Sequence, residues 1–281
     1  MAEPPDLAKR VADRIAAWRI VADGQLETDH SVLVFGRSDD RPVVLKVVKH
    51  RGNEWLTGRV LAAFDGHGTV RVYDAVEGAV LLERATPGTT LTATVARGAD
   101  EEATRVLART IRAMSARTVP PGTPTVEEWG AAFNRESGGR DEMVPTPLVS
   151  AAARVYSDLC RTQTRTRLLH GDLHHDNVLF DVDRGWLAID PKGVTGEIEY
   201  ETGAALRNPY DQPALFNDPA VIARRIRIFA EELAADPHRI AGWAFAQAVL
   251  AVIWANEDGA PVGADHRWIG LAETLQSMLT G

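Results

Sequence analysis

The chain has 281 residues, of which 45% are hydrophobic and 25% charged, and its formal net charge at pH 7 is −8. These proportions are those of an ordinary globular protein with one large or two modest domains. Surfaces that bind nucleic acid are basic, so the acidic balance argues against a nucleic-acid partner. The balance is compatible with a cationic small-molecule ligand, and equally with an acidic protein that has no such ligand.

The amino-terminal residues 1–10 are polar and contain Pro4 and Pro5, without the apolar stretch of a signal peptide. No uninterrupted run reaches the roughly 18 apolar residues of a membrane helix. We therefore expect a cytoplasmic protein without a membrane partner, and a monomer. The single cysteine, Cys160, lies in a helical stretch, where we expect a small core residue rather than a catalytic thiol.

The first third of the chain is rich in predicted strands. Residues 6–19 show the apolar spacing of a helix, and a second helix is expected from Glu54 to Phe64. Runs with many β-branched residues predict strands at Ile20–Leu26, Ser31–Phe35, Val43–Val48, Val70–Ala75 and Ala79–Glu83. The segment Gly24–Ser31 could cover a phosphate with the hydroxyl groups of Thr28 and Ser31, but an ordinary β-turn is the better explanation.

Lys46 is the informative residue of this part, because it interrupts an otherwise apolar strand. A buried ammonium group is costly unless it is paired. Lys46 could instead point to solvent from an edge strand. The functional alternative is a strand lysine aimed at nucleotide phosphates, with Glu54 as its helix partner. Glu54 could also be a first-turn acid that merely favours the helix dipole.

A break in the pattern divides the chain. Pro87 and Gly88 mark a connector, after which predicted helices dominate. We place a small lobe at residues 1–84, a hinge at 85–91 and a larger lobe at 92–281. The main-chain groups of Glu83 to Ala85 are the expected contacts for an adenine base. Helices are expected at Glu101–Arg117, Leu148–Arg161, Tyr200–Leu206, Pro219–Ala235, Ile240–Asn256 and Asp265–Leu279, and a loop at Ser137–Pro147.

One polar stretch concentrates the candidate chemistry. Asp172 and Asn177 are five residues apart in a loop, and Asp190 follows a predicted strand–turn–strand unit. Such a unit folds back on itself, so the two carboxylates and the amide should converge. This set offers one proton acceptor and two hard-oxygen ligands, as Mg²⁺-dependent phosphoryl transfer requires.

The histidines of the same stretch, His170, His174 and His175, suggest a zinc hydrolase as a further alternative. Adjacent histidines point in different directions, however, and no H-E-x-x-H motif or cysteine pair accompanies them. We expect His170 to brace the loop instead.

The spacing from Asp172 to Asn177 is that of the kinase catalytic loop, D-x-x-x-x-N. The motif H-G-D-x-x-x-x-N followed by I-D-P-x-G resembles the kinase-like aminoglycoside phosphotransferase family. Over residues 20–260 the chain looks most like the streptomycin 6-phosphotransferase group, which includes hydroxyurea phosphotransferases. The resemblance implies an α+β, protein-kinase-like fold with two lobes, a small β-rich one and a larger, mainly helical one.

The resemblance also implies roles. Asp172 would accept or orient the hydroxyl proton, and Asn177 and Asp190 would hold Mg²⁺. Lys46, positioned by Glu54, would grip the phosphates of ATP.

Streptomycin carries two guanidinium groups, which carboxylates should pair with. Glu197 is the first candidate for this pairing, followed by Glu199 and Glu257. The implied reaction is phosphorylation of streptomycin at its 6-hydroxyl. A kinase of another hydroxylated metabolite, or a nucleotide-binding pseudokinase that regulates a partner, stays open.

Overall fold

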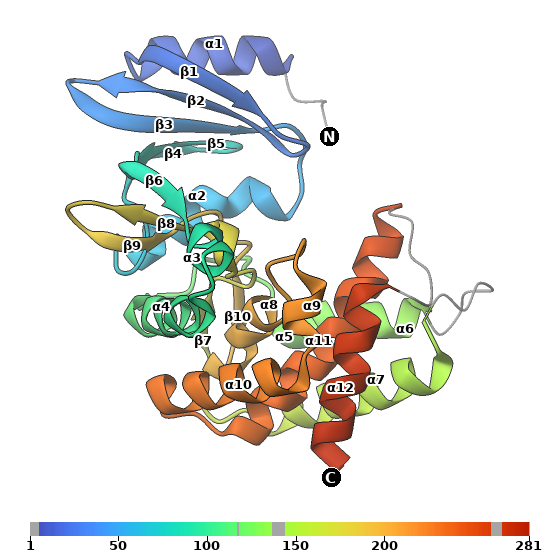
Figure 1. The fold of residues 1–281 in the computed structure, drawn as a ribbon. Coiled ribbons are helices and arrows are strands. Elements are labelled where there is room, and N and C mark those ends of the chain that lie inside the picture. The colour runs from blue at the N-terminus through green and yellow to red at the C-terminus, as the bar shows by residue number, and fades with distance from the viewer. Residues whose placement is uncertain (1–5, 117, 137–143, 260–265, 281) are drawn as a thin grey trace.

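The computed structural model describes residues 6–116, 118–136, 144–259 and 266–280. A small lobe built on a β-sheet lies above a larger lobe of helices, and a β-hairpin lies between them (Figure 1). This is the expected α+β arrangement. The expected loop at residues 137–147 falls mostly outside the described residues.

The small lobe is built on one antiparallel sheet of five strands in the order β1-β2-β3-β5-β4. The sequence predicts each of these strands, with ends that differ by a few residues. The strands are β1 (Val21–Glu27), β2 (Ser31–Ser38), β3 (Arg41–Val48), β4 (Val72–Val76) and β5 (Ala79–Glu83). Helix α1 (Leu7–Ala17) precedes them. The helix expected from Glu54 begins as a 3₁₀ turn, η1 (Asn53–Leu56), and continues as α2 (Thr57–Phe64).

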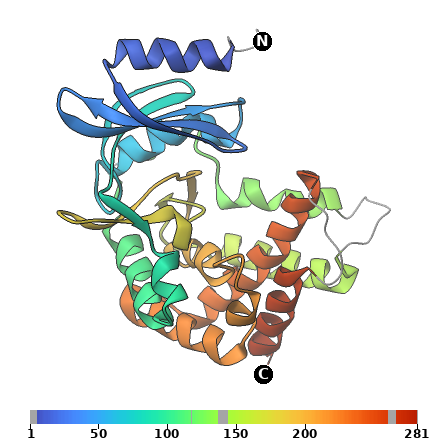
Figure 2. The ribbon, with the colours of Figure 1, turned by 45° about the horizontal axis from the view of Figure 1, so that its top comes forward.

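Side chains of β3 alternate between the two faces of the sheet, and this alternation decides where Lys46 points. Val43, Leu45 and Val47 pack in the apolar cluster under α1. Val44 packs on the other face, in the cluster that holds α2 residues. That face is turned toward the larger lobe (Figure 2). Lys46 shares it and is 4% exposed, so it lies between the lobes and not at a solvent-facing edge.

The connector, which the sequence marks by its Pro and Gly, is structured. It forms a strand that joins the interlobe hairpin in an antiparallel sheet of order β6-β8-β9. These strands are β6 (Pro87–Thr90), β8 (Val178–Asp181) and β9 (Gly185–Ala188). The Thr86 amide donates to the Asp181 carboxylate at 2.9 Å, and Arg84 pairs with Asp23 of β1 at 2.9 Å. The connector is therefore bound to the interlobe hairpin, and the small-lobe residue just before it is bound to β1, in both cases by contacts distant in sequence.

The larger lobe is mainly helical, and its long helices lie where the apolar periodicity predicts them. Short elements such as α3, β7 and β10 have only three to five residues, too few to display a period. The elements are α3 (Thr92–Ala96), α4 (Asp100–Ala113), α5 (Val126–Gly130), α6 (Ala132–Glu136), α7 (Thr146–Arg161), β7 (Arg167–Leu169), η2 (His175–Asn177), β10 (Val194–Gly196), η3 (Ile198–Glu201), α8 (Thr202–Leu206), α9 (Pro213–Phe216), α10 (Pro219–Leu233), α11 (Pro237–Glu257) and α12 (Arg267–Thr280).

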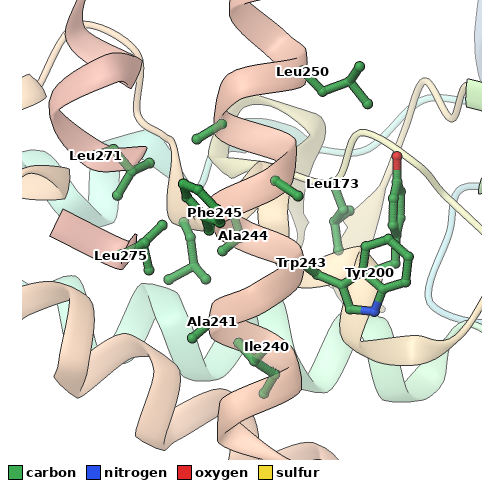
Figure 3. Close-up of a cluster of buried hydrophobic side chains, with 14 of the residues drawn as sticks. Leu173, Tyr200, Ile240, Ala241, Trp243, Ala244, Phe245, Leu250, Leu271 and Leu275 are labelled. Carbon is green, nitrogen blue, oxygen red and sulfur yellow. The ribbon is translucent and has the colours of Figure 1, made fainter. Parts of the chain in front are cut away.

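Helix α11 is the centre of the larger lobe. Every residue from Ile240 to Ile253 is buried. Trp243 meets the rings of Tyr156 and Tyr200 edge-on at 5.0 Å, and the opposite side of the helix packs against α12 (Figure 3). Among the described residues α11 is the one helix long and apolar enough to cross a membrane. Its position explains that composition, because a helix surrounded by protein is apolar all round.

A buried ion pair joins α4 to α10. Arg225 is 1% exposed, and its Nε lies 3.0 Å from Asp100 Oδ1. Arg224 also donates to the Asp100 carboxylate, at 2.9 Å. Burial acts to raise the pKa of Asp100, but the bonds from Arg225 and Arg224 bring it below its ordinary value. The carboxylate is therefore held ionised inside the lobe.

We expect Asp100→Ala to lower the free energy of unfolding by about 3–5 kcal/mol, because Arg225 would keep a buried charge without its partner. Urea denaturation measures the change. The matched control is Arg227→Ala, which breaks an exposed pair with Glu231 on the same α10 and should cost less than about 0.5 kcal/mol. Similar losses in the two variants would contradict this assignment.

Candidate active site

Two loops meet between the lobes, residues 170–177 after β7 and residues 189–193 after β9, and His170 ties them together. The His170 ring lies 2.7 Å from the carbonyl oxygen of Ile189. The His170 carbonyl accepts hydrogen bonds from the amides of Lys192 and Gly193, at 3.0 and 2.9 Å. Burial lowers the pKa of His170 to about 4, so the neutral ring donates to Ile189. His170 braces the loop, as expected.

Asp172 lies at the junction of the loops between two cations. Lys192 Nζ is 3.1 Å from one carboxylate oxygen, and Arg207 Nη2 is 3.3 Å from the other. Burial acts to raise the pKa of Asp172, yet the charges of Lys192, His174 and Arg207 hold it well below its ordinary range. An ionised Asp172 at neutral pH is the form that can accept a hydrogen bond from a hydroxyl group.

Asn177 and Asp190 are brought side by side by the hairpin. The Ile189 amide donates to the Asn177 carbonyl at 2.9 Å, which places Asp190 next to Asn177. Asn177 Nδ2 donates to the Asp172 carbonyl at 2.9 Å, so its Oδ1 is directed elsewhere. Asp190 has a φ of 60°, in the left-handed region. Such a conformation costs energy in a residue other than glycine and is common where a side chain must be aimed.

Lys46 connects this pair to the small lobe. Its Nζ lies 3.0 Å from Glu54 Oε2 and also contacts the Asp190 carboxylate closely. The structure therefore gathers Lys46, Glu54, Asp172, Asn177 and Asp190 between the lobes, as the sequence order predicts.

The oxygen atoms of Asn177 and Asp190 fit a magnesium ion. Mg²⁺ prefers hard oxygen ligands, and it commonly binds through one or two carboxylates together with water and substrate phosphates. The Asp190 side chain is 37% exposed, so it is accessible to such a complex. The remaining ligand positions would belong to phosphate and water, because this pair supplies only part of the octahedron.

The expected adenine contacts, Glu83 and Ala85, differ in their surroundings. The Glu83 side chain pairs with Arg184 and Arg71, and its amide donates to the Arg71 carbonyl at 2.9 Å. Among the described residues none hydrogen bonds to the main chain of Ala85. Ala85 therefore retains an amide and a carbonyl for a ligand, whereas Glu83 serves to hold the hairpin against the small lobe.

A cavity of about 420 Å³ opens beside the 170–177 loop. Its walls combine acidic side chains with two indole rings, those of Trp129 and Trp254, which meet edge-on at 5.6 Å. Glu257 is one of the acids, and Arg135 forms a two-bond contact with it at 2.7 and 3.0 Å. The lining residues are Pro124, Glu128, Trp129, Arg135, Gly171, Lys192, Arg207, Trp254, Glu257 and Asp258.

Two of the three predicted acceptor acids do not line this cavity. Glu197 is 5% exposed, and its carboxylate accepts from Arg239 Nε at 2.9 Å and from the Trp243 indole. It therefore neutralises a cation of α11 inside the lobe. Glu199, on η3, is half-buried and also lies outside the cavity lining. Of the three, Glu257 alone is on the wall.

Two of the other polar residues singled out from the sequence, His174 and Thr28, have structural contacts, whereas both ring nitrogens of His175 are buried without a hydrogen-bond partner among the described residues. His174 Nδ1 accepts from the Asp176 amide at 3.3 Å, and His175 is fully buried, so the adjacent rings do not converge. The Thr28 hydroxyl group donates to the Ser31 carbonyl and accepts from the Ser31 amide within the β1–β2 turn. Burial raises the pKa of Cys160 to about 12, in keeping with a residue that packs against the core.

Structural comparison identifies the fold. A choline kinase from Streptococcus pneumoniae matches with a TM-score of 0.65 at 16% identity, covering 96% of this chain and 99% of the other. An aminoglycoside phosphotransferase crystallised with ADP and hygromycin B matches with a TM-score of 0.63 at 16% identity, covering 95% and 97%. The protein therefore has the two-lobed, protein-kinase-like fold that these small-molecule kinases share.

Sequence comparison gives the family. Residues 17–259 match the family described as aminoglycoside/hydroxyurea antibiotic resistance kinase, and the chain belongs to it. Streptomycin 3''-kinase from Klebsiella pneumoniae is 34% identical over 86% of this chain and 91% of that protein. Streptomycin 6-kinase from Streptomyces griseus is 29% identical over 96% and 89%. Hydroxyurea phosphotransferase from Kitasatospora aureofaciens is 29% identical over 96% and 78%.

Several residues that contact the candidate site were not predicted from the sequence. Lys192 stood within the I-D-P-x-G motif and could have been found there. Arg207 and Trp129 carry no local signal, because helices distant in sequence bring them to the loop. Glu201 supports the loop from behind: its carboxylate accepts from the amides of His170 and Gly171, at 2.6 and 2.9 Å.

Glu201 predicts a pH dependence of stability. Burial raises its pKa to about 7, against the opposing effect of the backbone amides of Gly171 and His170. An unfolded glutamate titrates near 4.5, so the folded protein retains this proton to higher pH. The resulting stabilisation is complete below pH about 4.5 and is lost as the pH rises to about 7.

The comparison is with Glu201→Gln, which does not titrate. We expect the difference in unfolding free energy, wild type minus variant, to fall by about 3 kcal/mol as the pH rises through this window and to level off above it. Urea denaturation at pH 5, 6, 7 and 8 follows most of the change. A difference that is independent of pH would show that Glu201 does not titrate in this range.

Proposed function

We propose that the protein uses Mg²⁺ and ATP to phosphorylate a hydroxyl group of a cationic aminoglycoside, with streptomycin as the leading acceptor. One observation carries the proposal. Asp172 lies between the cluster of Lys46, Asn177 and Asp190 and a cavity walled by acids and indole rings. The names of the relatives, two streptomycin kinases among them, support the same acceptor.

On the phosphate side, Lys46 is the cation for the phosphate oxygens, and Glu54 fixes the direction of its ammonium group. Asn177 and Asp190 would hold Mg²⁺, which when bound neutralises charge on the phosphates. The free main-chain groups of Ala85 suit the adenine edge. In the structure Lys46 contacts Asp190. With nucleotide bound, Lys46 would pair with the phosphates and Asp190 with the metal ion.

On the acceptor side, Asp172 would accept a hydrogen bond from the reacting hydroxyl and orient its oxygen toward the γ-phosphorus. The bond from that oxygen to phosphorus forms as the bond from phosphorus to the β–γ bridging oxygen breaks. The hydroxyl proton passes to Asp172 and then to solvent, leaving ADP and a phosphate monoester. The low pKa of Asp172 suits late proton transfer in a loose transition state, where orientation contributes most.

The cavity walls suit a guanidinium ligand. Glu257 already holds the Arg135 guanidinium through two bonds, so its carboxylate has the required bidentate geometry. Glu128 and Asp258 add negative charge, and the faces of Trp129 and Trp254 can attract a cation. Streptomycin, with two guanidinium groups, matches these walls. We infer no acceptor role for Glu197 or Glu199.

The position phosphorylated has two candidates. The 6-hydroxyl is on the ring that carries the guanidinium groups, so its approach to Asp172 would bring those groups near Glu257. We therefore place it first. The 3''-hydroxyl is the second candidate, because the relative with 34% identity is a 3''-kinase. We infer a monomer that acts in the cytoplasm, where ATP is available, and a role in antibiotic resistance.

The proposal is tested by ADP release with streptomycin, other aminoglycosides, hydroxyurea and simple alcohols as acceptors. We expect streptomycin to give the highest kcat/KM, and the activity to disappear with EDTA. Asp172→Ala should lower kcat at least about 10³-fold, because positioning and proton acceptance are both lost, while ATP still binds. Phosphorus NMR of the product identifies the hydroxyl. Turnover that survives chelation or loss of Asp172 would contradict the mechanism.

Glu257→Gln should raise KM for streptomycin about tenfold or more and leave KM for ATP nearly unchanged, because the neutral amide cannot form a charged bidentate pair. The measurement is initial-rate kinetics with each substrate varied in turn. Glu273→Gln, which removes the same charge from an exposed position on α12, serves as the control. Equal effects on the two KM values would remove Glu257 from the acceptor site.

A further inference from the structure

We propose that Lys192 moves from Asp172 to the γ-phosphoryl group of ATP and stays with that group during transfer. The inference rests on the proposed phosphotransferase function and adds a catalytic residue to it. In the structure Lys192 Nζ lies 3.1 Å from Asp172 Oδ2, on the carboxylate that would orient the acceptor hydroxyl. A cation at this point is adjacent to the place where the new bond to phosphorus forms.

The two cations that flank Asp172 are not equivalent. Arg207 has an 8% exposed side chain, its Nη1 lies 3.3 Å from Gln247 Oε1, and its guanidinium group lies over the Trp268 ring at 5.9 Å. These contacts hold it behind the carboxylate. Lys192 has a 41% exposed side chain and faces the cavity. Arg207 can therefore keep Asp172 ionised after Lys192 has left it.

The backbone of Lys192 is anchored, whereas its side chain is half-exposed and has Asp172 as its ion-pair partner. Its amide donates to the His170 carbonyl at 3.0 Å, as does the amide of Gly193 at 2.9 Å. Gly193 has a φ of 79°, and a Cβ there would lie 2.5 Å from Val60. The ammonium group is therefore attached by a flexible side chain to a fixed backbone position between the lobes. This geometry lets it move a short distance from the Asp172 carboxylate to the oxygen atoms of the γ-phosphoryl group.

Of the cations near Asp172, Lys192 is the one placed to contact the γ-phosphoryl group during transfer. Among the described residues, three cations line the cavity: Arg135, Lys192 and Arg207. In the described part of the chain Arg135 pairs with Glu257 and not with Asp172, and Arg207 is buried behind Asp172. Lys46 lies at the other end of the site, between Glu54 and Asp190. A phosphoryl group passing toward Asp172 moves away from Lys46, and Lys192 is the cation it approaches.

The first test needs no acceptor. Lys192→Met and Lys192→Arg are compared with wild type by calorimetry, using Mg²⁺ with ADP and with an imido analogue of ATP that keeps the γ-phosphate. We expect Lys192→Met to lower the preference for the analogue over ADP about tenfold, and Lys192→Arg to keep most of it. The control is Lys9→Met, an exposed lysine of α1 paired with Asp13. An unchanged preference in Lys192→Met would overturn the proposal.

The second test uses turnover. Lys192→Met should lower kcat about 100-fold, because one donor to the charge in transit is lost, with KM for ATP changed much less. A change in KM for ATP without a change in kcat would overturn the assignment. If wild type binds nucleotide but phosphorylates no acceptor in the panel, the proposed function fails while the calorimetric comparison still decides the role of Lys192. Absence of Mg–nucleotide binding would overturn both.

Discussion

The candidate site depends on the contacts that His170 makes with both of its loops. The ring and the carbonyl of this one buried residue bond to Ile189, Lys192 and Gly193, across a gap of about twenty residues in sequence. Because polar groups buried without partners are costly, these bonds are hard to give up. They fix Asp172 relative to Asp190, and Glu201 holds the same loop from the other side.

The acidic groups of the larger lobe divide into two kinds according to their partners. Asp100 and Glu197 are buried against arginines, and they join α4 to α10 and the segment before η3 to α11. Glu257 is paired with an exposed arginine at a cavity wall, where we propose that a ligand replaces the arginine. Net charge in the sequence does not distinguish these cases, because the difference lies in how fully each pair is removed from water.

Much of the site could be predicted from the sequence because its members are carried by local patterns. The hairpin length places Asp190 beside Asn177, and the strand pattern singles out Lys46, although the sequence left open whether its side chain faces solvent or the other lobe. The acceptor acids could not be predicted in this way. Glu197 follows the 189–193 loop closely in sequence, yet Arg239 and Trp243 of α11 draw its side chain inward. The connector likewise became a strand through its pairing with β8.

The sequence by itself determined the two lobes, the order of the residues between them and the long helices, because periodicity and motif spacing are properties of short stretches of chain. The tertiary structure alone decided which charges neutralise one another: Glu197 with Arg239, Glu257 with Arg135, and Asp172 with Lys192 and Arg207. Most of these partners are separated by tens of residues or more, and their pairing depends on how the helices pack. The packing of the helices therefore decides which carboxylates are buried in structural pairs and which lie at a cavity wall.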